Sequence, residues 1–204
     1  TIMGSGTMVP SNKRNSSGVL IEYENTCSMV DFGYGSMHNL LTKGLTYHDI
    51  DRIYFTHNHP DHICDLVPFL FASRYPNDPR IKDLEIIAGP GFKIFFDTLM
   101  RAYKNWLIPT SYKVKILEQD EETKLYDGLS VTSKKVKHIE LSRGYRFEFP
   151  NGKSFAVSGD TDYCAGMVDL GREVDLMILE CSTPDNMKVQ GHMTPTECGK
   201  LAHQ

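Results

Sequence analysis

The chain lacks the marks of a membrane protein, of a disulfide-stapled protein and of a strongly basic protein. No apolar run in its 204 residues is long enough to cross a bilayer, and no secretory signal is visible. The five cysteines are odd in number, scattered and without a C-x-x-C pair, which favours free thiols in a reducing compartment. The net charge of -4 supplies no global basic field for nucleic acid or an anionic membrane. We therefore expect a cytoplasmic protein that does not bind membranes.

Internal repeats, low-complexity tracts and linkers are also missing. A chain of 204 residues with 40% hydrophobic content suffices for one well-packed domain, whereas two independent domains would each be small. The prediction is a single domain covering residues 1–204. Because Thr1 is not an initiator methionine, we expect further residues before it.

Hydrophobic periodicity predicts strands followed by helices, twice over. The first half has strand patterns at 18–24, 27–32, 52–56 and 85–88, and helical patterns at 36–43, after the motif at 57–62 and from Phe92 to Tyr103. The second half has strand patterns at 112–117, 129–136, 144–149, 154–158 and 175–180, and helical patterns at 165–171 and 194–202. Two such halves suggest two sheets packed face to face with helices outside.

The most informative stretch is the H-x-H-x-D-H motif that begins at His57, directly after the strand pattern 52–56. Imidazole and carboxylate groups together suit zinc, manganese or iron. His57 and His59 are two residues apart, so an extended backbone points them the same way, as two ligands of one ion. Asp61 and His62 follow a turn and face a different point, where a second ion is the natural occupant. A polar turn with surface histidines is the alternative, but turn chemistry calls for no histidine.

Two later polar residues stand at predicted strand ends. His138 follows the pattern 129–136, and the nearby histidine motif makes a ligand the better interpretation than a structural histidine. Asp160 follows the pattern 154–158, and Gly159 lets the backbone turn tightly so that the carboxylate projects. Because a carboxylate has two oxygens, Asp160 can bridge two cations.

The last part of the chain contains a histidine that folding does not explain. Thr194 before Pro195, with Glu197 three positions after Thr194, is typical of a helix N-cap with proline at the first helical position. That signature leaves His192 without a structural reason. Glu180 ends another strand pattern and is either a partner of His192 or a surface carboxylate.

Together these residues resemble the metallo-β-lactamase superfamily. The resemblance covers nearly the whole chain and rests on the segment 4–7, Asp31-Phe32-Gly33, the motif at 57–62, His138, Asp160 and His192. It implies an α/β (α+β) fold, a four-layer αββα sandwich with metals at the upper edge of the two sheets. Within the superfamily the chain is most similar to the ribonuclease Z, arylsulfatase and phosphodiesterase branch, through the segments 142–146, 158–161, 179–182 and 191–195.

The resemblance implies two divalent metal ions, with zinc favoured and manganese or iron as alternatives. Metal one would be held by His57, His59, His138 and Asp160, and metal two by Asp61, His62 and Asp160. The superfamily adds a further ligand histidine on a strand after the last helix. The sequence ends at Gln204 without it, so we expect a missing terminal segment, and occupancy of the second site stays open. Asp31 is expected beside the ligands rather than among them.

The implied activity is hydrolysis by a metal-activated water, with a small phosphodiester or nucleotide as the favoured substrate. Asp61 would orient or deprotonate the water, and His192, oriented by Glu180, would bind a phosphoryl oxygen or protonate the leaving group. One alternative is a ribonuclease Z-like tRNA 3′-processing endonuclease. Another is a hydrolase of thioesters, sulfate esters or lactams, or a non-catalytic scaffold. Relatives of this kind often dimerise, so a homodimer is a further expectation.

RNA is the less favoured substrate because the segment between His138 and Asp160 is short. Ribonuclease Z proteins insert a long arm between the counterparts of His138 and Asp160, and that arm grips tRNA. Here Asp160 comes 22 positions after His138, and the interval is filled by a predicted hairpin.

Overall fold

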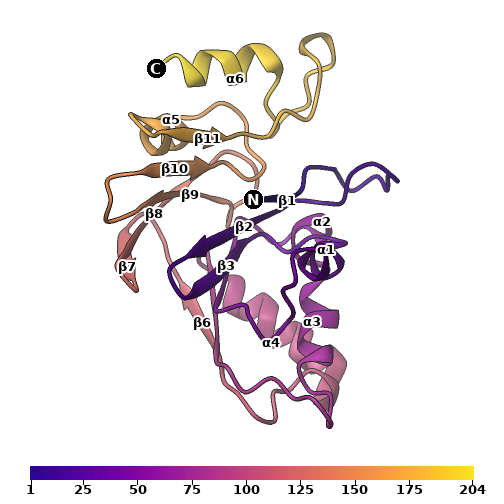
Figure 1. Cartoon of the computed structure of the whole chain (residues 1–204). Helices are drawn as coiled ribbons and strands as arrows, with labels where there is room; N and C mark the ends of the chain where they lie inside the picture. Colours follow the sequence, from indigo (N-terminus) through magenta and orange to yellow (C-terminus); the bar gives the residue numbers. More distant parts are fainter. The chain divides into compact units, whose positions relative to one another are not determined.

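The structure is a computed structural model that describes residues 1–204, and the chain divides into two compact units, 1–118 and 119–204. Each unit contains one β-sheet and its own helices (Figure 1). None of the helices combines the length and the apolar character that crossing a lipid bilayer requires.

Unit 1 is built on a six-stranded sheet, in the order β1-β2-β3-β4-β5-β6. Its strands are β1 (Ile2–Gly4), β2 (Gly18–Tyr23), β3 (Thr26–Val30), β4 (Arg52–Phe55), β5 (Leu84–Ala88) and β6 (Val114–Glu118). Its helices are α1 (Ser36–Thr42), α2 (Pro60–Ile63), α3 (Leu66–Ala72), α4 (Phe92–Tyr103) and the 3-10 turn η1 (Lys104–Trp106). The first three strands pair antiparallel and the last three add in parallel, so helices make the crossovers between β3 and β6.

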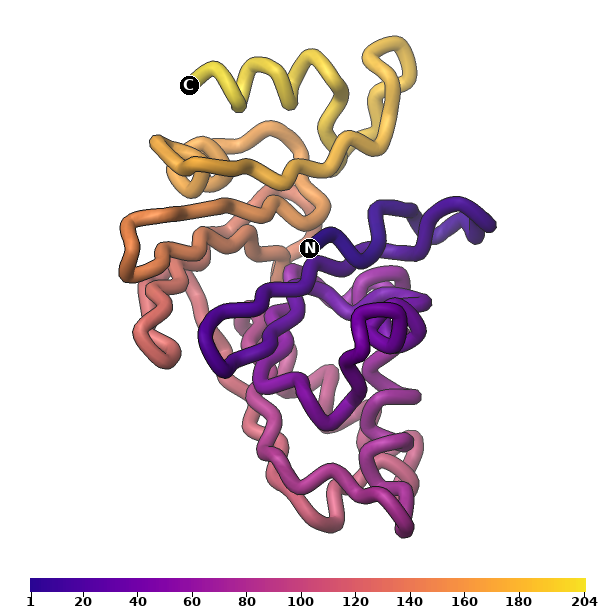
Figure 2. The backbone as a smooth tube through the Cα atoms, in the orientation of Figure 1, coloured from indigo at the N-terminus to yellow at the C-terminus, as the bar shows by residue number.

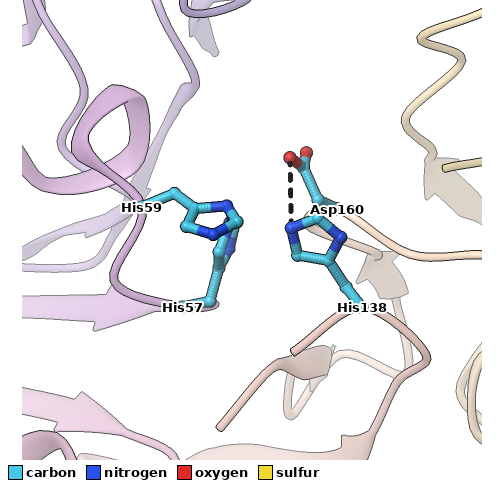
Figure 3. A group of neighbouring side chains, drawn as sticks. All are labelled: His57, His59, His138 and Asp160. Atoms are coloured by element: carbon cyan, nitrogen blue, oxygen red, sulfur yellow. Dashed lines mark hydrogen bonds and ion pairs between the residues drawn. The ribbon is translucent and has the colours of Figure 1, made fainter. Parts of the chain in front are cut away.

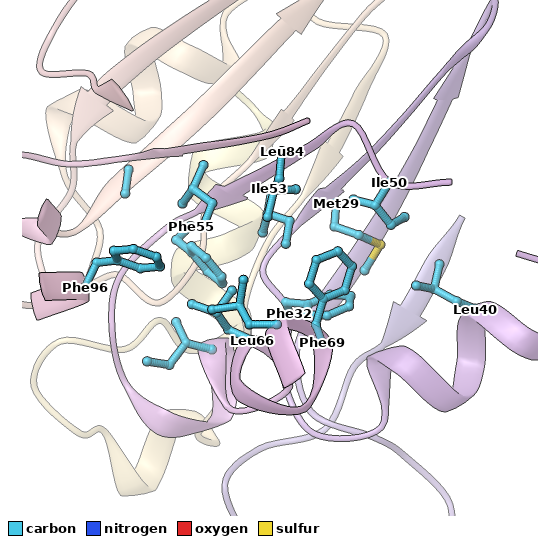
Figure 4. Packing of buried hydrophobic residues seen from close by; sticks show 14 of the residues in the cluster. Met29, Phe32, Leu40, Ile50, Ile53, Phe55, Leu66, Phe69, Leu84 and Phe96 are labelled. Carbon is cyan, nitrogen blue, oxygen red and sulfur yellow. The ribbon is translucent and has the colours of Figure 1, made fainter. Parts of the chain in front are cut away.

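The core of unit 1 forms where its helices pack on the sheet (Figure 4). Ile53 and Phe55 of β4 are fully buried in one cluster with Phe69 of α3 and Phe96 of α4. Strand alternation places Tyr54 on the other face of the sheet, where it is also fully buried. The histidine motif therefore leaves a strand that is packed on both faces.

The helical pattern after the histidine motif is broken into two helices. α2 ends at Ile63 and α3 begins at Leu66, so Pro68 falls in the first turn of the second helix. Proline is tolerated there because the first amides of a helix have no intrahelical acceptor.

A long excursion joins β1 to β2 in unit 1 and returns beside its own start (Figure 2). The Gly6 N–H donates to the Asn15 carbonyl at 2.7 Å, which closes this loop. The returning residues reach the end of β3, because the Ser17 hydroxyl donates to Asp31 at 3.2 Å. The loop is thus attached to the segment that supports the histidine motif.

Unit 2 contains a five-stranded sheet, in the order β11-β10-β9-β8-β7. Its elements are β7 (Thr123–Tyr126), β8 (Leu129–Lys135), β9 (Arg143–Glu148), β10 (Ser154–Val157), α5 (Ala165–Gly171), β11 (Leu176–Ile178), the 3-10 turn η2 (Asp185–Met187) and α6 (Pro195–Ala202). The two helices and the sheet share a core that includes Val136, Met167 and Leu201. The sequence did not indicate β7, which adds an antiparallel edge strand to β8.

Candidate metal centre

His57 and His59 follow β4, the backbone of His59 is extended, and the two rings turn toward one another (Figure 3). His57 Nε2 lies 3.0 Å from His59 Nδ1, and the ring centroids are 4.6 Å apart. His57 is fully buried and His59 is half-buried. One nitrogen of each ring therefore faces the same point, as two ligands of one cation would.

A single buried carboxylate, that of Asp31, orients two histidines of the motif. Asp31 Oδ2 lies 2.6 Å from His62 Nδ1. Thr56 Oγ1 lies 3.0 Å from each Asp31 carboxylate oxygen and 3.0 Å from His57 Nδ1. Because an ionised carboxylate only accepts, His62 Nδ1 and the Thr56 hydroxyl donate to Asp31, and His57 Nδ1 donates to the Thr56 oxygen. A proton on Nδ1 leaves each ring with a lone pair on Nε2, the form that binds a cation.

Asp61 and His62 lie in the next turn, in the short helix α2. His62 Nε2 lies 3.9 Å from Asp61 Oδ2. The His62 carbonyl accepts from the Phe32 N–H at 2.7 Å, which ties the turn to the segment after β3. The next residue, Gly33, has no room for a side chain, since a Cβ there would lie 2.0 Å from the Asp61 carbonyl oxygen. This close backbone packing fixes the positions of both Asp61 and His62.

In unit 2, His138 and Asp160 each lie three residues beyond the end of a strand, β8 and β10 respectively. His138 Nε2 lies 3.9 Å from Asp160 Oδ2, the contact dashed in Figure 3. His138 Nδ1 donates to the Gly191 carbonyl at 3.0 Å, because a carbonyl only accepts. His138 thus presents an unprotonated Nε2 beside Asp160. Gly159, at φ +57°, makes the turn that brings Asp160 there.

His192 and Glu180 form a pair beside Asp160. His192 Nδ1 lies 3.1 Å from Glu180 Oε1 and 3.9 Å from Asp160 Oδ2. Glu180 also accepts from the Thr161 N–H at 2.6 Å and from the Ser182 hydroxyl at 2.5 Å. These donors fix the carboxylate, so His192 Nδ1 donates to it and His192 presents Nε2 away from it. Glu180 is therefore buried against its partners and is not a surface carboxylate.

Burial raises the pKa of the Glu180 carboxyl above its ordinary value. Hydrogen bonds from Ser182 and Thr161 act in the opposite direction, the Asp160 carboxylate raises the pKa further, and His192 lowers it.

The loop that carries His192 is anchored at the start of α6. Thr194 and Glu197 form the expected capping box, in which the Thr194 N–H donates to Glu197 Oε2 at 2.9 Å, and Pro195 occupies the first turn. This prediction from the sequence is confirmed. The box fixes the backbone two residues after His192.

Some residues that orient the histidines of unit 1 and unit 2 could not be identified from the sequence. Thr56 acts through its hydroxyl and Gly191 through its backbone carbonyl, and neither residue type marks a metal site. Asp31 was expected beside the ligands, but the histidine it contacts depends on how the segment after β3 packs against α2.

Comparisons with known proteins agree with the fold. The protein family described as "Anti-Pycsar protein Apyc1" matches residues 1–202. The chain is similar to ribonuclease Z of Staphylococcus carnosus (strain TM300), with 30% identity over 177 residues that cover 85% of this chain. It spans 55% of the length of that relative, about half.

Two solved structures are also similar. The metallo-β-lactamase fold protein YhfI from Bacillus subtilis superposes with a TM-score of 0.83 at 22% identity, over 99% of this chain and 79% of that protein. A diphosphatase from the PhnP family superposes with a TM-score of 0.74 at 19% identity, over 100% of this chain and 81% of that protein. These likenesses show the fold, and the predicted metallo-β-lactamase fold is confirmed.

The family match extends over nearly all of the chain, and it includes both groups of histidines and carboxylates described above. The similar structures show that the chain shares their fold. The chain has the metallo-β-lactamase fold and belongs to the Anti-Pycsar protein Apyc1 family.

Proposed function

We propose that this protein hydrolyses small phosphodiesters, with cyclic nucleotides as the substrate class, by means of two divalent cations. The observation that carries the proposal is the orientation of His57, His62 and His138. Each donates from Nδ1 to a protein oxygen and so presents Nε2 as a ligand atom. The membership of the superfamily and the names of the similar proteins, a ribonuclease and a diphosphatase, support a reaction at phosphorus.

The donor chemistry of these residues fits divalent transition metals, since it mixes imidazole nitrogen with carboxylate oxygen. We propose one cation held by His57, His59, His138 and Asp160, and a second held by Asp61, His62 and Asp160. When bound, such a pair lowers the pKa of a water molecule and neutralises charge on phosphoryl oxygens. We favour zinc, with manganese and iron as the alternatives.

Two residues would move protons in the reaction. Asp61 accepts a proton from the attacking water as the water oxygen bonds to phosphorus. His192, whose Nδ1 donates to the Glu180 carboxylate, would transfer a proton from Nε2 to the leaving oxygen as the phosphorus–oxygen bond breaks. The His192 side chain is 23% exposed, so it is accessible to a substrate and still fixed by its partner.

A small substrate is favoured over tRNA by the interval between His138 and Asp160. β9 and β10 pair as a hairpin in register from Glu148 with Ser154 to Tyr145 with Val157, and the Phe149 N–H donates to the Lys153 carbonyl at the turn. The hairpin consumes the interval, so no arm extends from it. The net charge of -4 offers no other surface field for a long polyanion.

A substrate panel tests the proposal. The protein would be assayed with zinc or manganese against bis-(p-nitrophenyl) phosphate, cyclic nucleotides, an aryl sulfate, a chromogenic lactam and precursor tRNA. We expect hydrolysis of the phosphodiesters, abolished in His138→Ala, and weak, salt-sensitive binding of precursor tRNA. Turnover of the sulfate or the lactam, with none of the phosphodiesters, would reject the proposed reaction.

The second candidate is a tRNA 3′-processing endonuclease. The observation in its favour is the 30% identity to a protein named ribonuclease Z. Specific cleavage of precursor tRNA at physiological salt would promote this candidate over the first.

Two further proposals concern the state of the protein. The five cysteines are all unpaired, which favours a reducing compartment such as the cytoplasm. We also propose a homodimer, which light scattering coupled to size-exclusion chromatography would test directly.

A further inference from the structure

The ammonium group of Lys188 lies at a three-way contact next to His192. Lys188 Nζ donates to Asp162 Oδ1 at 2.6 Å and to the His192 carbonyl oxygen at 2.6 Å. It also pairs with Glu197 Oε2. A lysine ammonium has three N–H donors, and these three acceptors use all of them.

The loop around Lys188 is exposed, and the charged end of Lys188 ties it to the rest of unit 2. Met187 and Val189 are 67% and 50% exposed, and Lys188 is also an exposed residue. The ammonium group of Lys188 nevertheless contacts three acceptors. These contacts anchor the loop together with the two hydrogen bonds that Thr196 donates to Asp185.

The three partners of Lys188 belong to different parts of unit 2. Asp162 follows Asp160 after β10, and the Asp162 N–H donates to the Lys137 carbonyl, next to His138. Glu197 is the capping-box residue of α6. One side chain thus joins the Asp160 loop, the His192 loop and the start of α6.

The backbone at His192 is held from two sides. The Gly191 carbonyl accepts from His138 Nδ1, and the next carbonyl, that of His192, accepts from Lys188 Nζ. Gly191 has φ +87°, and a Cβ there would lie 3.0 Å from His138 Nδ1, so the turn has little freedom. The direction in which the His192 ring points depends on this turn.

We infer that Lys188 is a positioning residue for His192: it holds the His192 backbone so that Nδ1 stays on Glu180 and Nε2 faces the substrate. The inference rests on the proposed function, because the direction of the ring affects turnover only if His192 acts in the reaction. The ion pairs are partly buried, with Asp162 at 11% and Glu197 at 26% exposure, so they persist better than pairs in open solvent.

A double-mutant cycle isolates this role from general stabilisation. Lys188→Met keeps the length of the side chain and removes the ammonium. We expect kcat on a cyclic nucleotide to fall about tenfold or more, the range seen when a supporting partner is lost, with a smaller change in KM. In a His192→Ala background the same substitution should cost almost nothing further. Lys188→Arg should recover part of the loss.

Lys137→Met is the matched control. Lys137 Nζ lies 3.6 Å from Asp162 Oδ2 and its side chain is 61% exposed, so it shares one acidic partner with Lys188 without touching the His192 carbonyl. This control should keep the wild-type kcat. Thermal denaturation of both variants, measured in parallel, separates a loss of stability from a loss of turnover.

Histidine NMR of the metal-free full chain provides a readout that does not depend on activity. In the wild type, the His192 nitrogen signals should report one tautomer with the proton on Nδ1, and Lys188→Met should shift them toward a mixture. A loss of stability with unchanged kcat and unchanged His192 signals overturns the inference, as does a full additive loss in the His192→Ala background. If the wild type hydrolyses no phosphodiester, the proposed function fails, and the NMR comparison alone decides the role of Lys188.

Discussion

Asp31 Oδ2 lies 2.6 Å from His62 Nδ1, and the side chains of both residues are buried. The same carboxylate accepts from the Thr56 N–H at 2.8 Å and from the Thr56 and Ser17 hydroxyls. One buried charge therefore sets the direction of His62 directly and of His57 through Thr56. Asp31 has φ +58°, a left-handed backbone conformation that Asp and Asn tolerate better than most residues.

Asp31→Asn should weaken metal binding with little change in the backbone, because asparagine keeps the shape and removes the charge. Loss of such a partner lowers metal affinity by about 10- to 100-fold. A competition titration with a chromophoric chelator measures this. Asp51→Asn is the control, since Asp51 accepts from the Cys27 N–H and pairs with Lys82 in unit 1 but has no contact with the histidines among its interactions. Equal affinities of the two variants would contradict the role of Asp31.

The proposed ligands predict how many metal ions the protein binds and which substitutions remove them. The protein as found in the cell should bind about two transition-metal ions per chain, as two-metal hydrolases do. His59→Ala or His138→Ala should abolish hydrolysis and lower the metal content while the circular dichroism spectrum stays close to that of the wild type. Elemental analysis by mass spectrometry measures the content. An Asp160→Ala variant with full metal and full turnover would show that Asp160 bridges nothing.

His192→Ala should lower kcat for a phosphodiester by about 10²-fold or more, as expected when a positioned acid–base group is lost. Metal content should stay nearly unchanged, because His192 Nδ1 is engaged with Glu180. Glu180→Gln should lower kcat in the same direction, since it removes the carboxylate that accepts from His192 Nδ1 and orients the ring. Steady-state kinetics and metal analysis of the same preparations test this. A parallel loss of metal from His192→Ala would make that residue a ligand.

Arg80→Met should destabilise unit 1, although Arg80 is not one of the proposed site residues. Arg80 is fully buried and its guanidinium donates to the carbonyls of Tyr47, Ile50 and Asp83. Removing it leaves the buried Ile50 carbonyl and two partly buried carbonyls without this donor, at about 1 kcal/mol each, so unfolding should become easier by about 3 kcal/mol. Urea denaturation measures the change. Arg101→Met, on the exposed face of α4, should stay within about 0.5 kcal/mol, and an equally small effect at Arg80 would refute this account.

The sequence predicts well the elements whose structure depends on interactions between residues that are close in the chain. The capping box of Thr194 and Glu197 spans three residues, and the structure contains it. The paired strands β2 and β3 meet across a tight turn at 24–25, and their antiparallel register follows from that turn. In both cases the interacting groups are close in sequence, so local patterns suffice.

The parts that sequence misses depend on distant partners. β7 is four residues long with two polar side chains, and only its pairing with β8 defines it as a strand. Arg80 contacts carbonyls up to 33 residues away, and Lys188 contacts Asp162 26 residues away. A lysine or an arginine in a sequence gives no sign of such partners, because most of them stay solvated.

Anomalous diffraction from crystals of the zinc-loaded protein tests the central claim most directly. The account predicts two zinc peaks within bonding distance of protein atoms, both contacting Asp160, with His57, His59 and His138 on one and Asp61 and His62 on the other. Zinc bound at other residues, or no zinc at these residues in a saturating solution, would contradict it.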